Sequence, residues 1–358
     1  MPNAILTRAI DALASRADLS AEQTAEVLAE IMHGEVSETQ IAGFLIALRT
    51  KGETVPELAG LARTMRELAA HVPTERRDLL DTAGTGGGRS TFNVSTTAAL
   101  VAAGAGCAVA KHGNRSATSR SGSADLLEAL GARIDLEPTA VAACIGEAGF
   151  GFMFAPAHHQ ATRFVIPVRR ELAVRTIFNL LGPLTNPAGA RRQLIGVSDP
   201  SFLETMAGAL ALLGVDRALL VSSEDGLDEV SAEAPTRVVE VNGDELTRYV
   251  LQPEELGLAP RPDGPPARKV LAGGTPAENA AVTRAILAAE PAPGGERPAG
   301  EDLALVNAGA AIYAAGATQT IAAGVERARE ALADGSAADA LERYVQVSRR
   351  LAPAEVTG

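Results

Sequence analysis

The chain has 358 residues, 46% hydrophobic and 21% charged, a composition typical of a folded globular protein rather than a disordered one. Its net charge of −12 argues against a broad nucleic-acid or anionic-membrane surface, and the 3% aromatic content without Trp argues against base-stacking platforms. At roughly 150 residues per domain, the length predicts two domains.

The first seventy residues predict several short amphipathic helices. Capping-box patterns occur at three places, namely Ser20 with Gln23, Ser37 with Gln40, and Thr54 with Glu57. Gly34 and Gly52 stand where two of the helices should end. The N-terminus contains Asp11 and Asp18 and no continuous apolar stretch, so it does not resemble a secretory signal, and we expect a cytoplasmic protein without membrane spans.

From Leu79 onward, short apolar runs alternate with helical patterns. The expected strands are 79–82, 108–110, 193–197 and 218–221, and the expected helices are 98–103, 123–130 and 202–213. This alternation predicts an α/β domain with a largely parallel sheet. Two Pro/Gly-rich stretches, 256–266 and 290–300, predict surface loops. Cys107 and Cys144 lie in alanine-rich surroundings and are expected to be buried, reduced thiols.

A glycine-rich stretch, DTAGTGGGRSTFNVST from Asp81 to Thr96, follows the first predicted strand and precedes a helix. Glycines let backbone N–H groups approach phosphate oxygens, and a helix N-terminus favours negative charge, so the stretch is a candidate phosphate site. It does not fit the dinucleotide-binding pattern, because Arg89 stands where that pattern needs glycine, and no Lys-Ser/Thr follows as in a Walker loop. Close packing of a strand against a helix explains the glycines equally well.

Two charged clusters follow later apolar runs. Residues 111–123, KHGNRSATSRSGS, offer three cations and several hydroxyls in an otherwise acidic chain, which suits a multiply anionic ligand. Residues 224–229, EDGLDE, contain four carboxylates that repel one another unless a cation such as Mg²⁺ relieves them. Solvated surface loops are the alternative for both clusters.

Residues 154–187 hold two adjacent histidines, His158 and His159, together with Arg169 and Arg175. Side chains of sequence neighbours rarely point at one ion, and no third soft ligand is near, so a metal site is not favoured here. The two arginines are either surface charges or clamps for a carboxylate.

The chain resembles the anthranilate phosphoribosyltransferase family of tryptophan biosynthesis over nearly its whole length, as far as the segment beginning at Asn307. The motifs that carry the resemblance are, in order, GTGGG, FNVST, KHGNRS, SGSADLLEALG, FMFAP, RTIFNLLGPLTNP and DGLDE. The resemblance implies a small helical domain, residues 1–72 with part of 165–190 packed on it. It also implies a larger α/β domain, residues 73–358, of the type shared with pyrimidine nucleoside phosphorylases, and a homodimer formed through the helical domain.

The implied reaction transfers the phosphoribosyl group of 5-phosphoribosyl-1-pyrophosphate (PRPP) to the amine of anthranilate. The matching PRPP-binding positions are Gly84, Gly86, Gly87, Asn93, Val94, Ser95, Thr96, Lys111, His112, Gly113, Asn114, Arg115, Ser116, Ser119 and Ser123. The matching Mg²⁺ positions are Ser95, Asp228 and Glu229, and the anthranilate positions are Gly84, His112, Asn114, His159, Arg169 and Pro183. No acid–base dyad is implied, because the aniline amine is neutral near pH 7 and the charges that develop need positioning and electrostatic stabilisation.

Three features depart from the pattern usual in that family. The usual GTGGDG is replaced by a loop one residue shorter, with Gly88 and Arg89, and therefore without its carboxylate. Ala173 stands at a usual glycine, and Gln160 at a usual proline. Two other functions fit the sequence less well. The pair of motifs KHGNR and DGLDE argues against a nucleoside phosphorylase, and the net charge argues against a non-catalytic nucleic-acid-binding relative.

Overall fold

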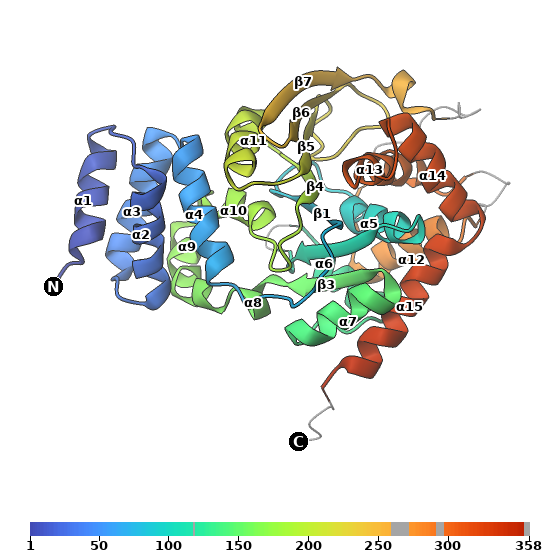
Figure 1. Cartoon of the computed structure of the whole chain (residues 1–358), viewed down its shortest axis with the longest axis horizontal. Coiled ribbons are helices and arrows are strands. Elements are labelled where there is room, and N and C mark those ends of the chain that lie inside the picture. Colours follow the sequence, from blue (N-terminus) through green and yellow to red (C-terminus); the bar gives the residue numbers. More distant parts are fainter. Residues whose placement is uncertain (117–118, 259–271, 291–296, 354–358) are drawn as a thin grey trace.

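The computed structural model describes residues 1–116, 119–258, 272–290 and 297–353. Four helices at the N-terminus stand beside a seven-stranded sheet covered on both faces by further helices (Figure 1). The N-terminal helices are α1 (Ala4–Ala14), α2 (Ala21–His33), α3 (Glu38–Lys51) and α4 (Val55–Glu67). This arrangement of a small helical part and a larger α/β part is the predicted fold class.

The helix ends follow the capping signals, with one exception. Ser20 and Gln23 form a reciprocal capping box at α2, and Gly34 ends that helix in the left-handed conformation at φ 80°. At α3, Ser37 accepts a hydrogen bond from the Gln40 N–H, but the Gln40 side chain does not return to Ser37. Its amide oxygen instead accepts the N–H of Asn3 at 2.9 Å, so the predicted helix start is confirmed but only one bond of the capping box forms, and the Gln40 side chain joins α3 to the start of α1.

The sheet has the order β3-β2-β1-β4-β5-β6-β7. Its strands are β1 (Leu79–Gly84), β2 (Ala108–Gly113), β3 (Phe150–Phe154), β4 (Arg192–Gly196), β5 (Arg217–Ser223), β6 (Thr236–Asn242) and β7 (Glu245–Leu251). The pairs among β1 to β5 are parallel, as predicted, whereas β6 and β7 add an antiparallel hairpin. That hairpin was not predicted, although its Asn242-Gly243-Asp244 turn is a hairpin signal.

Different helices cover the two faces of the sheet (Figure 1). One face carries α5 (Val94–Gly104), α7 (Pro138–Ala148), α13 (Glu301–Ala314) and α15 (Ser336–Leu351), with α12 (Pro276–Leu287) and α14 (Ile321–Ala333) packed on these. The other face carries α10 (Phe178–Leu184) and α11 (Leu203–Leu212). The remaining helices are α6 (Ser123–Ala129), α8 (Ala155–His158) and α9 (Ile166–Leu172).

Alternate residues of the strands supply two separate apolar cores, as the two-residue period of a strand requires. On β5, Leu219 and Val221 join the core under α5 and α13, whereas Ala218 and Leu220 join the core under α10 and α11. The second core continues into α1 to α4 and also includes Val168 of α9. The helical part is therefore packed on one face of the sheet through shared apolar contacts.

Both cysteines are free and buried, as predicted. Burial raises the pKa of each thiol to about 11. No helix within the described ranges is both long and apolar enough to cross a membrane. The predicted surface loops 256–266 and 290–300 lie largely outside the described residues.

Candidate active site

The charged and glycine-rich clusters meet at the carboxyl edge of the parallel strands. The chain runs outward from β1 to β3 and then returns to place β4 on the other side of β1, so the strand order reverses between β1 and β4. The glycine-rich stretch follows β1, the basic cluster follows β2, and the acidic cluster follows β5. Ligands of open α/β sheets bind at such a reversal, outside the carboxyl ends of the strands.

The glycine-rich stretch curves around the carboxylate of Asp228. The Gly86 N–H donates to that carboxylate. A Cβ atom built on Gly84 would lie 3.2 Å from Asp228 Oδ2, and one on Gly88 would lie 2.3 Å from Oδ1. Side chains at these positions would displace the carboxylate, which is why this stretch needs glycines.

Contacts from two other regions hold the same loop. The Arg175 guanidinium and the Ser198 hydroxyl both donate to the Gly86 carbonyl, at 3.0 and 2.9 Å. Arg49 of α3 donates to the Arg175 carbonyl at 2.7 Å, which connects the helical part to the loop. Arg89, the departure from the family pattern, forms an ion pair with Asp225 at 3.5 Å, so the shortened loop is fixed to the acidic segment.

The four carboxylates of the acidic cluster do not face one another, contrary to the sequence interpretation. Glu224 pairs with Arg237 at 3.6 Å, and the Asp225 carboxylate accepts the hydroxyls of Ser223 and Ser231. The Asp228 carboxylate accepts the Gly86 N–H of the glycine loop, and the Glu229 carboxylate accepts the Ser95 N–H of the first turn of α5. Two of the four carboxylates, Glu224 and Asp225, are therefore held by partners outside the pair formed by Asp228 and Glu229.

Asp228 and Glu229 form no ion pair among the described residues, although Arg175 lies near Asp228 and Lys111 near Glu229. Glu229 accepts the Ser95 N–H, but burial and the nearby Asp228 charge raise its pKa to about 8, with the positive charge of Lys111 opposing the shift. Burial also raises the pKa of Asp228. No group of three or more His, Cys, Asp or Glu side chains suited to a metal occurs among the described residues. Two carboxylates with the Ser95 hydroxyl nevertheless fit Mg²⁺, which prefers oxygen ligands and completes its shell with water and substrate phosphate.

Lys111 lies beneath the glycine loop, 1% exposed. Its ammonium donates to the carbonyl of Thr82, to the Thr82 hydroxyl at 3.2 Å and to the Ser95 hydroxyl at 3.4 Å. Burial lowers its pKa to about 8, although Asp81 and Glu229 oppose that shift. The ammonium is therefore a buried positive charge beside the first turn of α5.

Asn93 connects the glycine loop to the basic cluster. It precedes α5 in the left-handed conformation at φ 69°, which Asn tolerates better than most residues. Its amide donates to the Ser121 carbonyl at 2.9 Å and accepts from Asn279 at 2.7 Å. Val94 and Thr96 of the first turn are buried, and the Thr96 hydroxyl has no hydrogen-bond partner in the part of the chain that the structure describes.

The polar residues after β2 mostly bind one another. The hydroxyls of Ser116 and Ser119 lie 2.6 Å apart. Arg115 forms ion pairs with Asp125 at 2.8 Å and with Glu128 at 2.5 Å, so its guanidinium is committed to α6 in this structure. Asn114 is exposed and accepts the Arg115 N–H. Gly113 and Ser123 are packed together, with a Cβ on Gly113 lying 3.1 Å from that of Ser123.

Two predicted acceptor-site histidines lie together, with ring centroids 5.1 Å apart. His112 Nδ1 donates to the Gly182 carbonyl, next to the buried Pro183, and its Nε2 has no hydrogen-bond partner among the described residues. His159 Nε2 donates to the Thr185 carbonyl. Burial lowers the pKa of His112 to about 3 and that of His159 to about 4, so both rings are neutral at physiological pH.

Arg169 of α9 is a partly buried cation whose guanidinium lies 5.5 Å from the Phe178 ring centroid. The structure shows no ion pair for it among the described residues, and burial lowers its pKa. Its neighbour Arg170 is exposed. Arg169 is thus the better placed of the two to meet a carboxylate.

The sequence did not predict the contacts of two supporting residues, Asp81 and Arg175. Asp81, fully buried, accepts the His112 N–H at 3.1 Å and the Asn186 amide at 2.8 Å, and burial raises its pKa to about 6. Arg175 was noted as a possible carboxylate clamp, yet it binds the glycine loop. An acidic residue inside an apolar run was the available signal for Asp81, but nothing in the sequence indicates the contact of Arg175.

Comparisons with known proteins agree over nearly the whole length of the chain. Residues 76–338 match the family described as "Glycosyl transferase family, a/b domain", and residues 7–69 match "Glycosyl transferase family, helical bundle domain". The chain is 51% identical over 350 residues to the anthranilate phosphoribosyltransferase of Rubrobacter xylanophilus, covering 97% of this chain and 99% of that protein. The crystal structure of the Thermus thermophilus anthranilate phosphoribosyltransferase is similar with a TM-score of 0.87 at 49% identity, covering 95% of this chain and 99% of that one. The Saccharomyces cerevisiae enzyme in complex with PRPP and Mg gives a TM-score of 0.86 at 28% identity, covering 98% and 99%.

Proposed function

Because this chain belongs to the anthranilate phosphoribosyltransferase family, we propose that the loops at the carboxyl ends of β1, β2 and β5 form its active site. The protein transfers the phosphoribosyl group of PRPP to the amine of anthranilate, giving N-(5-phosphoribosyl)anthranilate and pyrophosphate in tryptophan biosynthesis. It is a pentosyltransferase. The observation that carries the site assignment is the glycine loop wrapped around the carboxylate of Asp228, beside the first turn of α5.

The PRPP-binding residues in this proposal are those of the glycine loop, the first turn of α5 and the segment from Lys111 to Ser123. The pyrophosphate oxygens accept hydrogen bonds from loop N–H groups and from the hydroxyls of Ser95 and Thr96, at a helix N-terminus that favours negative charge. The unpartnered Thr96 hydroxyl supports this placement. Lys111 contributes a buried charge close to the leaving group rather than a mobile surface contact.

Asp228 and Glu229, with the Ser95 hydroxyl, are the proposed ligands of Mg²⁺. Their raised pKa values support a site that is completed by a divalent cation and substrate phosphate. When bound, the ion adds positive charge where pyrophosphate leaves. The enclosing glycine loop keeps the two carboxylates close to that charge.

The acceptor site lies between Arg169 and the two neutral histidines. Arg169 pairs with the anthranilate carboxylate through a forked hydrogen bond, and Asn114 orients it. The unprotonated Nε2 of His112 is a buried acceptor without a partner in the described structure, so it orients an N–H of the anthranilate amine. Positioning of a neutral amine requires no strong base.

The reaction is tested directly by the loss of anthranilate fluorescence when PRPP and Mg²⁺ are added. Losing a charged hydrogen bond costs about 1.5–3 kcal/mol, so Arg169→Ala should raise the anthranilate KM at least about tenfold and leave PRPP affinity nearly unchanged. Arg170→Ala is the matched control. Equal small effects of the two variants, or a larger effect of Arg170→Ala, would contradict the assignment of Arg169.

A homodimer through the helical part, a division of the chain at residues 72 and 73, and a cytoplasmic location complete the proposal. Ile46 of α3 and Ile166 of α9 are large exposed apolar side chains, 37% and 42% exposed, on two helices that pack together. An apolar surface of this kind suits contact with a second copy. Light scattering on the purified protein measures the mass, and Ile46→Glu with Ile166→Glu should convert a dimer to a monomer.

A further inference from the structure

On the N-terminal side of Asp228 and Glu229, hydrogen bonds and close packing hold the backbone in place. The Leu227 N–H donates to the Ser223 hydroxyl at 3.2 Å, and the Ser223 N–H donates to the Leu227 carbonyl at 3.1 Å. The Asp228 carbonyl lies against Gly196 of β4, where an added Cβ would be only 1.7 Å away. The backbone on the C-terminal side of the pair, at Val230, needs a separate contact to hold it.

A buried amide from another helix holds Val230. Asn307 of α13 is 0% exposed and is the only polar side chain between Leu303 and Ile312. Its Oδ1 accepts the Val230 N–H at 2.9 Å, and its Nδ2 donates to the Val230 carbonyl at 2.9 Å and to the Leu303 carbonyl at 2.8 Å. One side chain thereby satisfies both backbone groups of Val230, as a neighbouring strand would.

This contact requires a carboxamide of this length. An ionised aspartate has no donor for the Val230 carbonyl, and leucine of similar size has neither a donor nor an acceptor. Val230 is 0% exposed, so its N–H and carbonyl have no access to water if the amide is removed. Unsatisfied buried groups are costly, and the segment would shift to find new partners. Glu229 is the adjacent residue, so such a shift moves the carboxylate pair.

We propose that Asn307 is a positioning residue for the divalent-cation site, acting through Val230 on Glu229 and Asp228. The inference rests on the proposed assignment of that pair as the Mg²⁺ ligands. Asn307 touches neither substrate nor metal. Its effect is to hold the two carboxylates in one arrangement before the cation and pyrophosphate arrive, which lowers the cost of ordering them on binding.

The test compares Asn307→Leu with Ile312→Ala, a substitution that also removes buried contacts from α13 but at an apolar residue whose side chain forms no hydrogen bond with Val230. For Asn307→Leu, the Mg²⁺ concentration at half-maximal activity should rise about tenfold, as for the loss of a supporting contact around a metal site. The kcat at saturating Mg²⁺ should stay within about threefold, because saturation restores the site. Ile312→Ala should lower thermal stability and leave the Mg²⁺ dependence unchanged.

A second readout does not depend on turnover. Binding of Mn²⁺ in the presence of pyrophosphate, measured by electron paramagnetic resonance, should weaken in Asn307→Leu by the same factor as the Mg²⁺ dependence. Asn307→Asp keeps the shape and the bond to the Val230 N–H, so it is the variant to use if Asn307→Leu does not fold, and it should change both readouts in the same direction.

The outcomes distinguish the positioning role of Asn307 from the assignment of Asp228 and Glu229 as metal ligands. A folded Asn307 variant with wild-type Mn²⁺ affinity overturns the positioning inference, provided that Asp228→Asn with Glu229→Gln abolishes Mn²⁺ binding. If that double variant binds Mn²⁺ as the wild type does, the assignment of the metal ligands itself is wrong.

Discussion

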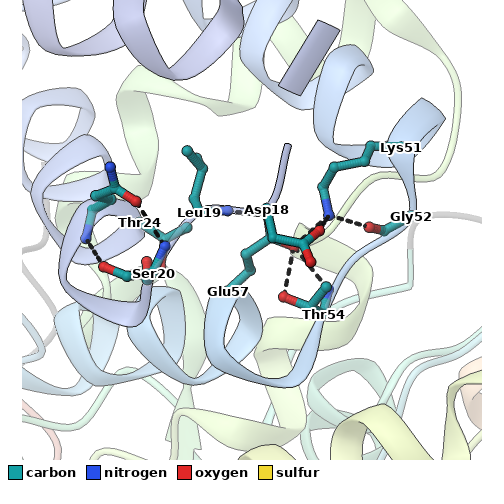
Figure 2. A network of polar contacts seen from close by, with 9 residues as sticks. Asp18, Leu19, Ser20, Thr24, Lys51, Gly52, Thr54 and Glu57 are labelled. Atoms are coloured by element: carbon teal, nitrogen blue, oxygen red, sulfur yellow. Dashed lines mark hydrogen bonds and ion pairs between the residues drawn. The ribbon is translucent and has the colours of Figure 1, made fainter. Parts of the chain in front are cut away.

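Two partly or fully buried glutamates of this chain have opposite surroundings. Glu57 lies in the helical part, fully buried, where the start of α4 meets the end of α3 and the loop before α2 (Figure 2). Its carboxylate accepts from Lys51 at 2.9 Å, from the Leu19 N–H at 3.0 Å and from the Thr54 N–H at 2.8 Å. Glu229 lies beside a second carboxylate, Asp228, and accepts the Ser95 N–H.

The comparison separates a structural carboxylate from one reserved for a ligand. Around Glu57 the ammonium of Lys51 supplies the compensating charge, and the N–H groups of Leu19 and Thr54 donate to the carboxylate, so its hydrogen bonds are completed within the protein. Around Glu229 the repulsion from Asp228 remains, with the ammonium of Lys111 committed to Thr82 and Ser95. A carboxyl whose pKa is raised by burial and by a neighbouring carboxylate is typical of a functional site.

Neutralising the carboxylate pair tests the comparison most strongly. Asp228→Asn with Glu229→Gln keeps the shape of both side chains and removes their charge. Activity should fall at least about 10³-fold, equivalent to about 4 kcal/mol in the activation barrier, because the cation and the charge it brings to the leaving group are lost. The melting temperature should not fall, since a repulsion is also removed. Near-native turnover at limiting Mg²⁺ would contradict the metal assignment.

Removing the carboxylate of Glu57 should lower stability and leave the activity nearly unchanged. Glu57→Ala leaves the N–H groups of Leu19 and Thr54 without their acceptor and removes one of the two carboxylates that pair with Lys51, and breaking a buried ion pair costs about 3 kcal/mol of unfolding free energy. Turnover per folded molecule should remain close to wild type, because this network lies outside the proposed site. Urea denaturation measures the loss, and Glu26→Ala on the exposed surface of α2 serves as the control. A stability loss no larger than that of the control would show that the network is not structural.

The histidines of the acceptor site should make stability depend on pH. Folding lowers the pKa of His159 from 6.5 to about 4, so the unfolded chain binds the proton more readily between these values. The free energy of unfolding should therefore fall as the pH decreases from 6.5 towards 4, by about 3 kcal/mol for this group. Urea denaturation of His159→Gln should show a shallower dependence over this range. The same substitution at the exposed His71 should leave the slope as in the wild type, and an equal change in both variants would refute this explanation.

The smallest expected effect concerns the segment that joins α9 to the sheet. Ala173 has φ 51°, the left-handed region that glycine adopts without steric cost. Ala173→Gly should raise the free energy of unfolding by about 0.5–1 kcal/mol, because the strain of the Cβ is removed. Ala25→Gly, within α2, should lower it by about 1 kcal/mol. A destabilising Ala173→Gly would show that the strain is absent.

Sequence patterns predicted four of the five parallel strands, all but β3, together with the N-terminal helices and α5, α6 and α11, because these depend on local periodicity and caps. The glycine loop, the basic cluster and the acidic cluster were also located correctly relative to the strands, since parallel strands place their carboxyl ends at one edge. Contacts between distant residues were not predictable. Nothing local distinguishes Asp225, which binds neighbouring hydroxyls, from Asp228, or shows that Gln40 reaches Asn3. The burial of Lys111 beneath the loop likewise follows from the order of the strands in space.

The two buried thiols provide a direct way to follow the loop. Only the thiolate reacts with alkylating reagents, and burial holds the pKa of Cys107 and Cys144 near 11, so both are nearly inert at neutral pH. A cysteine introduced at the exposed Ser90 would be the single fast-reacting thiol of the folded protein. A spectroscopic label attached there would report the movement of the glycine loop with no native cysteine having to be replaced.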